Sequence, residues 1–310
     1  MSNTTKADLL MVLVTLLAAV SWIFSKEAVM QMPPLLFMGI RFLMAGALLA
    51  LVGWRLMRRL TMDQCKRAMM VGLVFGIAMS FWVTGLHRGT HVGEGAFLTS
   101  LAVVLVPVIA RLVFRETPPA STWLALPVAV AGLALLSLEH GFRPEAGQLY
   151  FVLAAAIFAL YFSMNTQAAN TQTLTTRDGA VQQREKVPVI ALTAMVLLTV
   201  GVFTSVLSLL LEPWAPTFRS FSLELAGWVV ASAVIGTAAR FFVQTWAQSL
   251  SNHSHGVVIL VIEPIWVALF AAGWFGETMS LQQLGGCALI FTALLVNRWG
   301  AVRKLIKGWL

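Results

Sequence analysis

Successive apolar runs, each about as long as a membrane is thick, constrain this chain more than any other feature of its sequence. A helix needs about 20 residues to cross the hydrocarbon layer of a bilayer. Ten runs approach that length, and short charged or turn-forming segments separate them. The pattern predicts an all-α, polytopic membrane protein with ten transmembrane helices. They are expected at residues 8–29, 35–54, 68–86, 93–114, 120–138, 147–167, 188–211, 225–247, 255–275 and 281–298.

Composition excludes a soluble domain. Only 11% of the residues are charged and 59% are hydrophobic, whereas soluble domains carry about 25% charged residues. The formal net charge of +8 does not indicate a nucleic-acid partner, because the Lys and Arg residues lie between the apolar runs. The expected partners are the lipid bilayer and a small-molecule substrate.

The basic residues also predict an orientation. Fourteen of the 21 Lys and Arg residues fall in segments that would share one side of the membrane, whereas Arg88, Arg143 and Arg219 fall on the other. Because basic residues favour the cytoplasmic side, we expect both termini in the cytoplasm and the chain in a bacterial inner membrane. The first apolar run could imitate a signal peptide, but it continues past Trp22, so we expect it to be retained.

Two short similarities suggest an internal duplication. Residues 114–117 (Phe-Arg-Glu-Thr) recur as residues 275–278 (Phe-Gly-Glu-Thr), at an offset of 161 positions, and residues 76–78 resemble residues 236–238 at an offset of 160. The predicted units are residues 1–145 and 146–310. Because each holds five helices, an odd number, the second would insert upside down, as in secondary transporters that alternate access. A purely structural duplication is the alternative.

Several motifs lie within the predicted helices. They are Trp22 with Lys26, Arg41 with Phe42, residues 96–100 (Ala-Phe-Leu-Thr-Ser) through Val106-Pro107, Glu263-Pro264, and Gly276-Glu277. In these motifs the chain resembles the ten-helix, EamA-type branch of the drug/metabolite transporter superfamily. The resemblance implies export, or occasionally uptake, of amino acids, metabolites or toxic compounds through a central cavity. Glu94 and Arg240 depart from the family pattern, which disfavours a generic apolar drug.

Five charged residues within the predicted helices are the first candidates for substrate binding. A charge inside the bilayer costs about 2.5–3.5 kcal/mol on insertion scales, so it usually faces a cavity or a partner. Arg240 and Glu263 could meet as a pair, either as a fixed lock between two helices or as a site that opens, with Arg240 binding an anionic group and Glu263 a proton or an ammonium group. Lys26, Arg41 and Glu94 could form a polar cluster near the outer face, or serve only as interfacial residues.

Aromatic and amide side chains complete the candidate site. Arg240 and Gln244 share one helix face, as do Tyr161 and Asn165, because each pair is four residues apart. Trp residues usually lie at the ends of membrane-spanning helices. Trp22, Trp82 and Trp266 lie away from the ends of their helices. These residues suit a substrate with an apolar part and a charged head, although each could simply pack or bond between helices.

The sequence therefore predicts a secondary exporter of a small zwitterionic or amphipathic metabolite, with protons as a candidate coupling ion. No cofactor is expected, because no nucleotide-binding loop or catalytic Ser or Cys signature is present. The His residues fall in loops, so we predict no metal site. The alternatives are a channel or an integral membrane enzyme that acts on a lipid-linked substrate.

Overall fold

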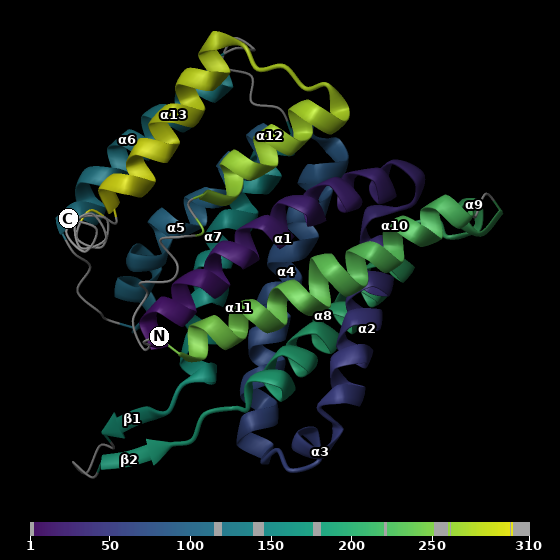
Figure 1. Ribbon diagram of the computed structural model, residues 1–310, viewed down its shortest axis with the longest axis vertical. Coiled ribbons are helices and arrows are strands. Elements are labelled where there is room, and N and C mark those ends of the chain that lie inside the picture. The colour runs from purple at the N-terminus through teal and green to yellow at the C-terminus, as the bar shows by residue number, and fades with distance from the viewer. Residues whose placement is uncertain are drawn as a thin grey trace.

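The computed structural model describes residues 3–114, 120–138, 146–175, 181–219, 222–250, 260, 262–297 and 299. These residues are almost entirely helical, with one small two-stranded sheet (Figure 1). In chain order the elements are α1 (Asn3–Gln31), α2 (Pro34–Val52), α3 (Trp54–Met57), α4 (Met62–Arg88), α5 (Val92–Phe114), α6 (Ala120–Leu138), α7 (Ala146–Ala169), β1 (Gln172–Thr175), β2 (Val181–Arg184), α8 (Val189–Leu211), α9 (Ala215–Arg219), α10 (Leu223–Ala233), η1 (Val234–Ala239), α11 (Arg240–Ser249), α12 (Glu263–Phe275) and α13 (Leu281–Asn297).

The long helices confirm an all-α membrane protein. Within the described residues, six helical segments are long and apolar enough to cross a bilayer, and four further apolar helical segments are shorter. The six lie in α1, α2, α4, α7, α8 and the continuous segment Leu223–Ser249, and the shorter ones are Val92–Val106, Trp123–Gly132, Glu263–Phe275 and Leu281–Ala293. The predicted span 255–275 is seen only from Leu260 onward, because residues 251–259 and 261 lie outside the described part.

Helices from the first and second halves of the chain pack against one another. α2 lies along α8, α4 along α7, and α6 along α13 (Figure 1). α1 runs beside the continuous segment of α10, η1 and α11, and α5 contacts both α7 and α12. Close approach depends on small residues: a Cβ added to Gly46 or Gly201 would lie within 3 Å of the backbone of the partner helix. The core therefore consists of contacts between helices of the first and second halves of the chain.

Local sequence explains several helix boundaries. α4 begins at Met62, earlier than the predicted residue 68, because Thr61 and Gln64 form a capping box that supports an extra polar turn. α12 ends at Gly276, which adopts a left-handed conformation with φ +66°. The chain then turns so that the carboxylate of Glu277 accepts hydrogen bonds from the backbone N–H groups of Val92 and Gly93, at 2.8 and 3.1 Å. The Gly-Glu motif thus ends one helix and caps another.

The predicted polar linker at residues 168–187 contains the antiparallel hairpin β1–β2. Hydrogen bonds and an ion pair hold the hairpin and the residues after it to the start of α4: Arg184 pairs with Asp63, and Arg67 donates to the Glu185 carbonyl at 2.6 Å. The hydrogen bond to Asp63 raises the pKa of Arg184. This contact fixes the hairpin at the end of the molecule where α3 lies (Figure 1).

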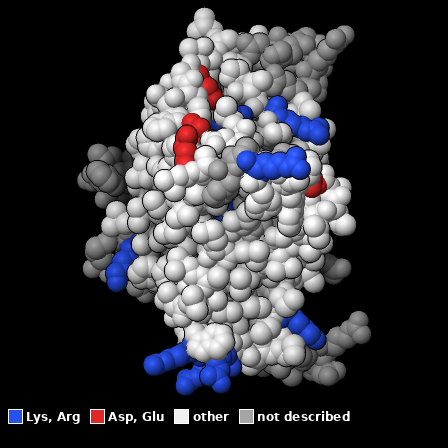
Figure 2. Space-filling view, turned by 90° about the vertical axis from the view of Figure 1, so that its right-hand side faces the viewer, with Lys and Arg blue, Asp and Glu red and all other residues white. Residues whose placement is uncertain are grey.

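Charged side chains cover little of the surface, and basic ones gather at one end of the molecule (Figure 2). On the face in Figure 2, Lys and Arg gather at the lower end, and most of the surface between the charged groups is uncharged. Large apolar side chains are exposed on the helices, among them Leu51 of α2 and Leu210 and Leu211 of α8, each at least 70% exposed. An exposed apolar surface with basic residues gathered at one end is typical of a protein that lies in a bilayer.

Candidate functional site

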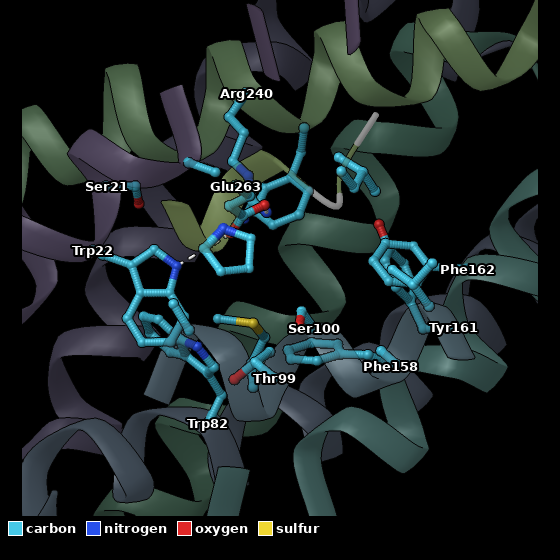
Figure 3. A pocket seen from close by; sticks show the side chains of 18 of the residues that line it. Ser21, Trp22, Trp82, Thr99, Ser100, Phe158, Tyr161, Phe162, Arg240 and Glu263 are labelled. Carbon is cyan, nitrogen blue, oxygen red and sulfur yellow. Dashed lines mark hydrogen bonds and ion pairs between the residues drawn. The ribbon is translucent and has the colours of Figure 1, made fainter. Parts of the chain in front are cut away.

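A cavity lies between the two halves of the chain (Figure 3). Its free volume is about 70 Å³, which is room for a few ordered water molecules. Six of the eleven predicted site residues line it, and the lining comes from both halves of the chain. The lining residues are Ala18, Ser21, Trp22, Arg41, Phe75, Met79, Trp82, Ala96, Thr99, Ser100, Ala102, Val103, Phe158, Tyr161, Phe162, Arg240, Phe241, Leu260, Glu263 and Pro264.

Glu263 joins the halves of the chain at this cavity. Its Oε1 accepts a hydrogen bond from Nε1 of Trp22 at 3.2 Å, and its Oε2 lies 3.5 Å from Nη2 of Arg240. The structure therefore forms the predicted pair between Arg240 and Glu263. Glu263 is the first residue of α12 and Pro264 follows it, so the helix begins where proline is best tolerated.

The Arg240 guanidinium is only partly engaged. At 3.5 Å its contact with Glu263 is at the outer limit of a hydrogen bond, and within the described residues its Nε has no hydrogen-bond partner. The group lies over the ring of Phe241, 4.6 Å from the centroid. Arg240 thus has hydrogen-bond donors left with which it can bind another anionic group.

Arg41 is the most deeply buried charged side chain of this cavity, at 1% exposure. Its guanidinium donates to the hydroxyls of Ser25 and Ser21 at 2.6 and 2.7 Å, to the hydroxyl of Thr237, and to the Gly236 carbonyl at 3.2 Å. The last two groups belong to η1, whose wider turns occur often at functional sites. Neutral oxygens therefore solvate this charge.

Aromatic rings form the two side walls (Figure 3). Trp22 meets Trp82 edge to face at a centroid distance of 4.7 Å. On the other side, Tyr161 stacks on Phe75 at 4.1 Å, and Phe75 meets Phe241 at 5.0 Å. Such contacts hold the rings in fixed orientations. The walls can receive a flat apolar group.

Five predicted site residues lie outside this cavity lining. Nζ of Lys26 donates to the Leu86 and Gly89 carbonyls at 3.0 and 2.9 Å, where α4 ends. Glu94 accepts from the amide of Gln148. The structure thus separates Lys26 and Glu94 from Arg41, which lies in the cavity wall and not in an outer cluster with them.

The other three are buried or half-buried between helices. The Asn165 amide donates to Oε1 of Gln248 at 2.6 Å, which is the interhelical bond that the sequence left open as an alternative. Among the described residues, the side-chain amide of Gln244 and Nε1 of Trp266 have no hydrogen-bond partner. Neither residue lines the cavity.

Sequence reasoning missed the hydroxyl groups and several rings of the cavity. Thr99 and Ser100 line it opposite Glu263 (Figure 3), with their hydroxyls bonded to carbonyls of their own helix. Two adjacent hydroxyl residues in an apolar helix were the available signal. Phe158 and Phe162 lie four residues apart and flank Tyr161, so that spacing could have predicted the aromatic wall.

An apolar helical protein with a charged cavity between its halves has the build of a membrane transporter. The profile of the EamA-like transporter family matches residues 5–138 and again residues 145–299. The chain therefore belongs to the EamA-like transporter family of the drug/metabolite transporter superfamily.

Relatives agree with this assignment. An uncharacterized transporter of Archaeoglobus fulgidus is 24% identical over 296 residues, covering 94% of this chain and 85% of its own. A second uncharacterized transporter of that organism is 24% identical over 224 residues, covering 67% and 68%. A crystal structure of a protein 20% identical in sequence superposes with a TM-score of 0.65 over 97% of this chain and 99% of that one, so the two share a fold.

Proposed function

We propose that this transporter is a secondary exporter of a small zwitterionic or amphipathic metabolite, and that it works by alternating access between two inverted five-helix repeats. The repeats are residues 1–145 and 146–310, and the ten helices cross a bacterial inner membrane with both termini in the cytoplasm. Export is the direction that the resemblance to drug and metabolite exporters favours. Protons are the proposed coupling ion.

Helix packing supports the inverted repeats. With helices numbered within each repeat, α1 beside the α10–α11 segment is a first helix against a third helix, and α7 beside α4 is the same pairing with the repeats exchanged. Likewise α2 and α8 are equivalent helices, as are α6 and α13. Such reciprocity is expected of two units related by a twofold axis in the membrane plane. The two separate family matches also support it.

The observation that carries the proposal is the double contact of Glu263. One partner, Trp22, belongs to the first proposed repeat, and the other, Arg240, belongs to the second. If the repeats rock against each other, these contacts cannot both keep their geometry. A proton or a substrate group that competes for the carboxylate can therefore favour one arrangement over the other, which is what coupling requires.

The cavity supplies the contacts that we assign to the substrate. Trp22, Trp82 and Tyr161 would hold its apolar part, and Arg240 and Glu263 its polar head, with Arg41 behind them. A free volume of about 70 Å³ is smaller than the 300–1,000 Å³ of typical ligand pockets, so substrate entry requires the walls to move. For Lys26, Glu94, Asn165, Gln244 and Trp266, a direct substrate contact stays a prediction.

A flux screen in liposomes tests the proposal. The purified protein is reconstituted and assayed with amino acids, polyamines and amphipathic ions, and each hit is repeated with Arg240→Gln and Glu263→Gln. Arg240→Gln should lower the flux of the true substrate at least about tenfold, as expected when a contact worth about 1.4 kcal/mol is lost, and Glu263→Gln should lower the flux that a pH gradient drives. The control is Asp63→Asn with Arg184→Gln, which removes an exposed ion pair far from the cavity. Equal loss in the control, or no loss in either cavity variant, would contradict the proposed site.

A further inference from the structure

We infer that the substrate of this cavity is an organic monoanion with an aromatic or similarly flat apolar part. The inference rests on the proposed transport function and narrows its substrate class. A zwitterion, which the sequence left open, becomes the competing result.

The charge of the cavity lining points to an anion. Of the described residues that line it, the charged ones are Arg41, Arg240 and Glu263, so the lining carries one more positive than negative charge. A charge removed from water is costly unless it is paired. A bound anion would complete the pairing.

Arg41 supplies the excess charge and keeps it in place. Four hydrogen bonds hold its guanidinium, and all four acceptors are neutral oxygens. The rings of Phe37 and Phe42 lie 5.5 Å from its Cζ and help to solvate it. These four hydrogen bonds leave the guanidinium of Arg41 little capacity to bind a ligand. Arg41 therefore acts as a positioning residue, through the electric field of its charge.

Arg240 is the group that we expect to contact the anion. Its Nε has no hydrogen-bond partner among the described residues, and Nη2 reaches Glu263 only at 3.5 Å. A carboxylate can engage two donors of a guanidinium at once. The N-terminus of α12, at Glu263 and Pro264, adds positive potential on the same side of the cavity.

The aromatic walls indicate the apolar part of the substrate. Trp22 and Trp82 stand on one side and Phe158, Tyr161 and Phe162 on the other, and the charged pair lies between these walls (Figure 3). A flat apolar group can lie between such rings while its head points at Arg240. An ammonium group would have to rely on Glu263, which already accepts from Trp22 and faces Arg240.

Four ligands with the same ring and different charges test the inference. They are phenylpropionate (anion), phenylalanine (zwitterion), phenylpropanamide (neutral) and phenethylamine (cation). Binding to the full-length protein in nanodiscs is measured by titration calorimetry, and flux is measured in liposomes. We expect the anion to bind at least about tenfold more tightly than each of the others. Equal or tighter binding of phenylalanine or phenethylamine, or no binding of the anion, would overturn the inference.

Charge-changing variants supply the second arm. Glu263→Gln makes the lining more positive, so the anion should bind more tightly than it does to the wild type, and the dianion phenylsuccinate should gain more. Arg41→Gln should abolish the preference for the anion, whereas Arg41→Lys should keep it. If Arg41→Gln does not fold, the Glu263→Gln arm decides. Asp63→Asn changes an exposed charge to the same extent and should leave the ligand order unchanged.

The transport site and the anionic substrate can be contradicted by different results. Flux of phenylalanine that depends on Arg240 and exceeds anion flux would overturn the anion inference and leave the transporter site standing. Flux that no cavity variant alters, for any of the four ligands, would overturn the proposed site itself.

Discussion

Arg41 donates a hydrogen bond to the Thr237 hydroxyl, which in turn donates to the Ser232 carbonyl five residues earlier, at 2.8 Å. This chain links α2 to the π-helical turn of η1. The wider turn presents both the Thr237 hydroxyl and the Gly236 carbonyl to one guanidinium. A local irregularity in one helix thus solvates a charge from another helix.

Thr237→Val should destabilise the protein, because it removes a buried acceptor from a charged donor. The expected loss in the free energy of unfolding is about 1.5–3 kcal/mol, measured by denaturation in mixed micelles. Thr204→Val is the matched control: Thr204 is as deeply buried, but among the described residues its hydroxyl bonds only to carbonyls of its own helix. Equal destabilisation by both substitutions would contradict the special role of Thr237.

Glu263→Gln should remove the pH dependence of flux while sparing exchange of substrate across the membrane. A carboxylate that binds either Arg240 or a proton can couple transport to proton movement. The amide of glutamine cannot, because it does not take up a proton near neutral pH. The measurement is flux into liposomes with and without an imposed pH gradient. Glu185→Gln, on the exposed segment after β2, is the control. Unaltered pH-driven flux in Glu263→Gln would remove this residue from the coupling mechanism.

Trp22→Phe should slow transport more than Trp82→Phe does. Both substitutions keep an aromatic ring in the wall, but only the first deletes the donor that holds Oε1 of Glu263. A lost bond to a charged group corresponds to roughly a tenfold effect or more. Initial rates with the same substrate measure it. If the two variants were equally active, the contact between Trp22 and Glu263 would have no part in transport.

Glu277→Ala should lower stability without changing substrate selectivity. Its carboxylate caps α5 through two backbone N–H groups, and losing such a cap costs about 0.5–2 kcal/mol. Thermal unfolding in detergent measures the change. Glu224→Ala is the comparison, since the bond that this exposed residue makes within the described part of the chain is to Trp228, four residues along its own helix. A change in ligand order with no change in melting temperature would assign Glu277 to the site instead.

Sequence reasoning recovered the features that depend on one helix at a time. Apolar runs predicted the helical segments, and the approach of Arg240 to Glu263 followed from their similar depth in neighbouring spans. Depth does not fix the direction of a side chain around its helix, however. That is why Arg41 was grouped with Lys26 and Glu94, although it points into the cavity and they do not line it.

The remaining site residues depend on contacts between distant helices. Asn165 contacts Gln248 because α7 packs against α11, and Arg41 contacts Thr237 because α2 packs against η1. Single-helix periodicity carries no information on such partners. Thr99 and Ser100 were noted only as part of a family motif and not as site residues; hydroxyl residues in helices often bond to carbonyls of their own helix, as both of these do.

In the proposed mechanism, one cavity opens in turn to each side of the membrane. Cysteine accessibility tests it directly: both native cysteines, Cys65 and Cys287, are replaced, Ser100→Cys is introduced, and flux is verified in the resulting variant. An impermeant thiol reagent is then applied from each side of uniformly oriented proteoliposomes. The account predicts labelling of this cysteine from both sides, and protection by substrate in each case. Labelling from one side only, in a variant that still transports, would contradict it.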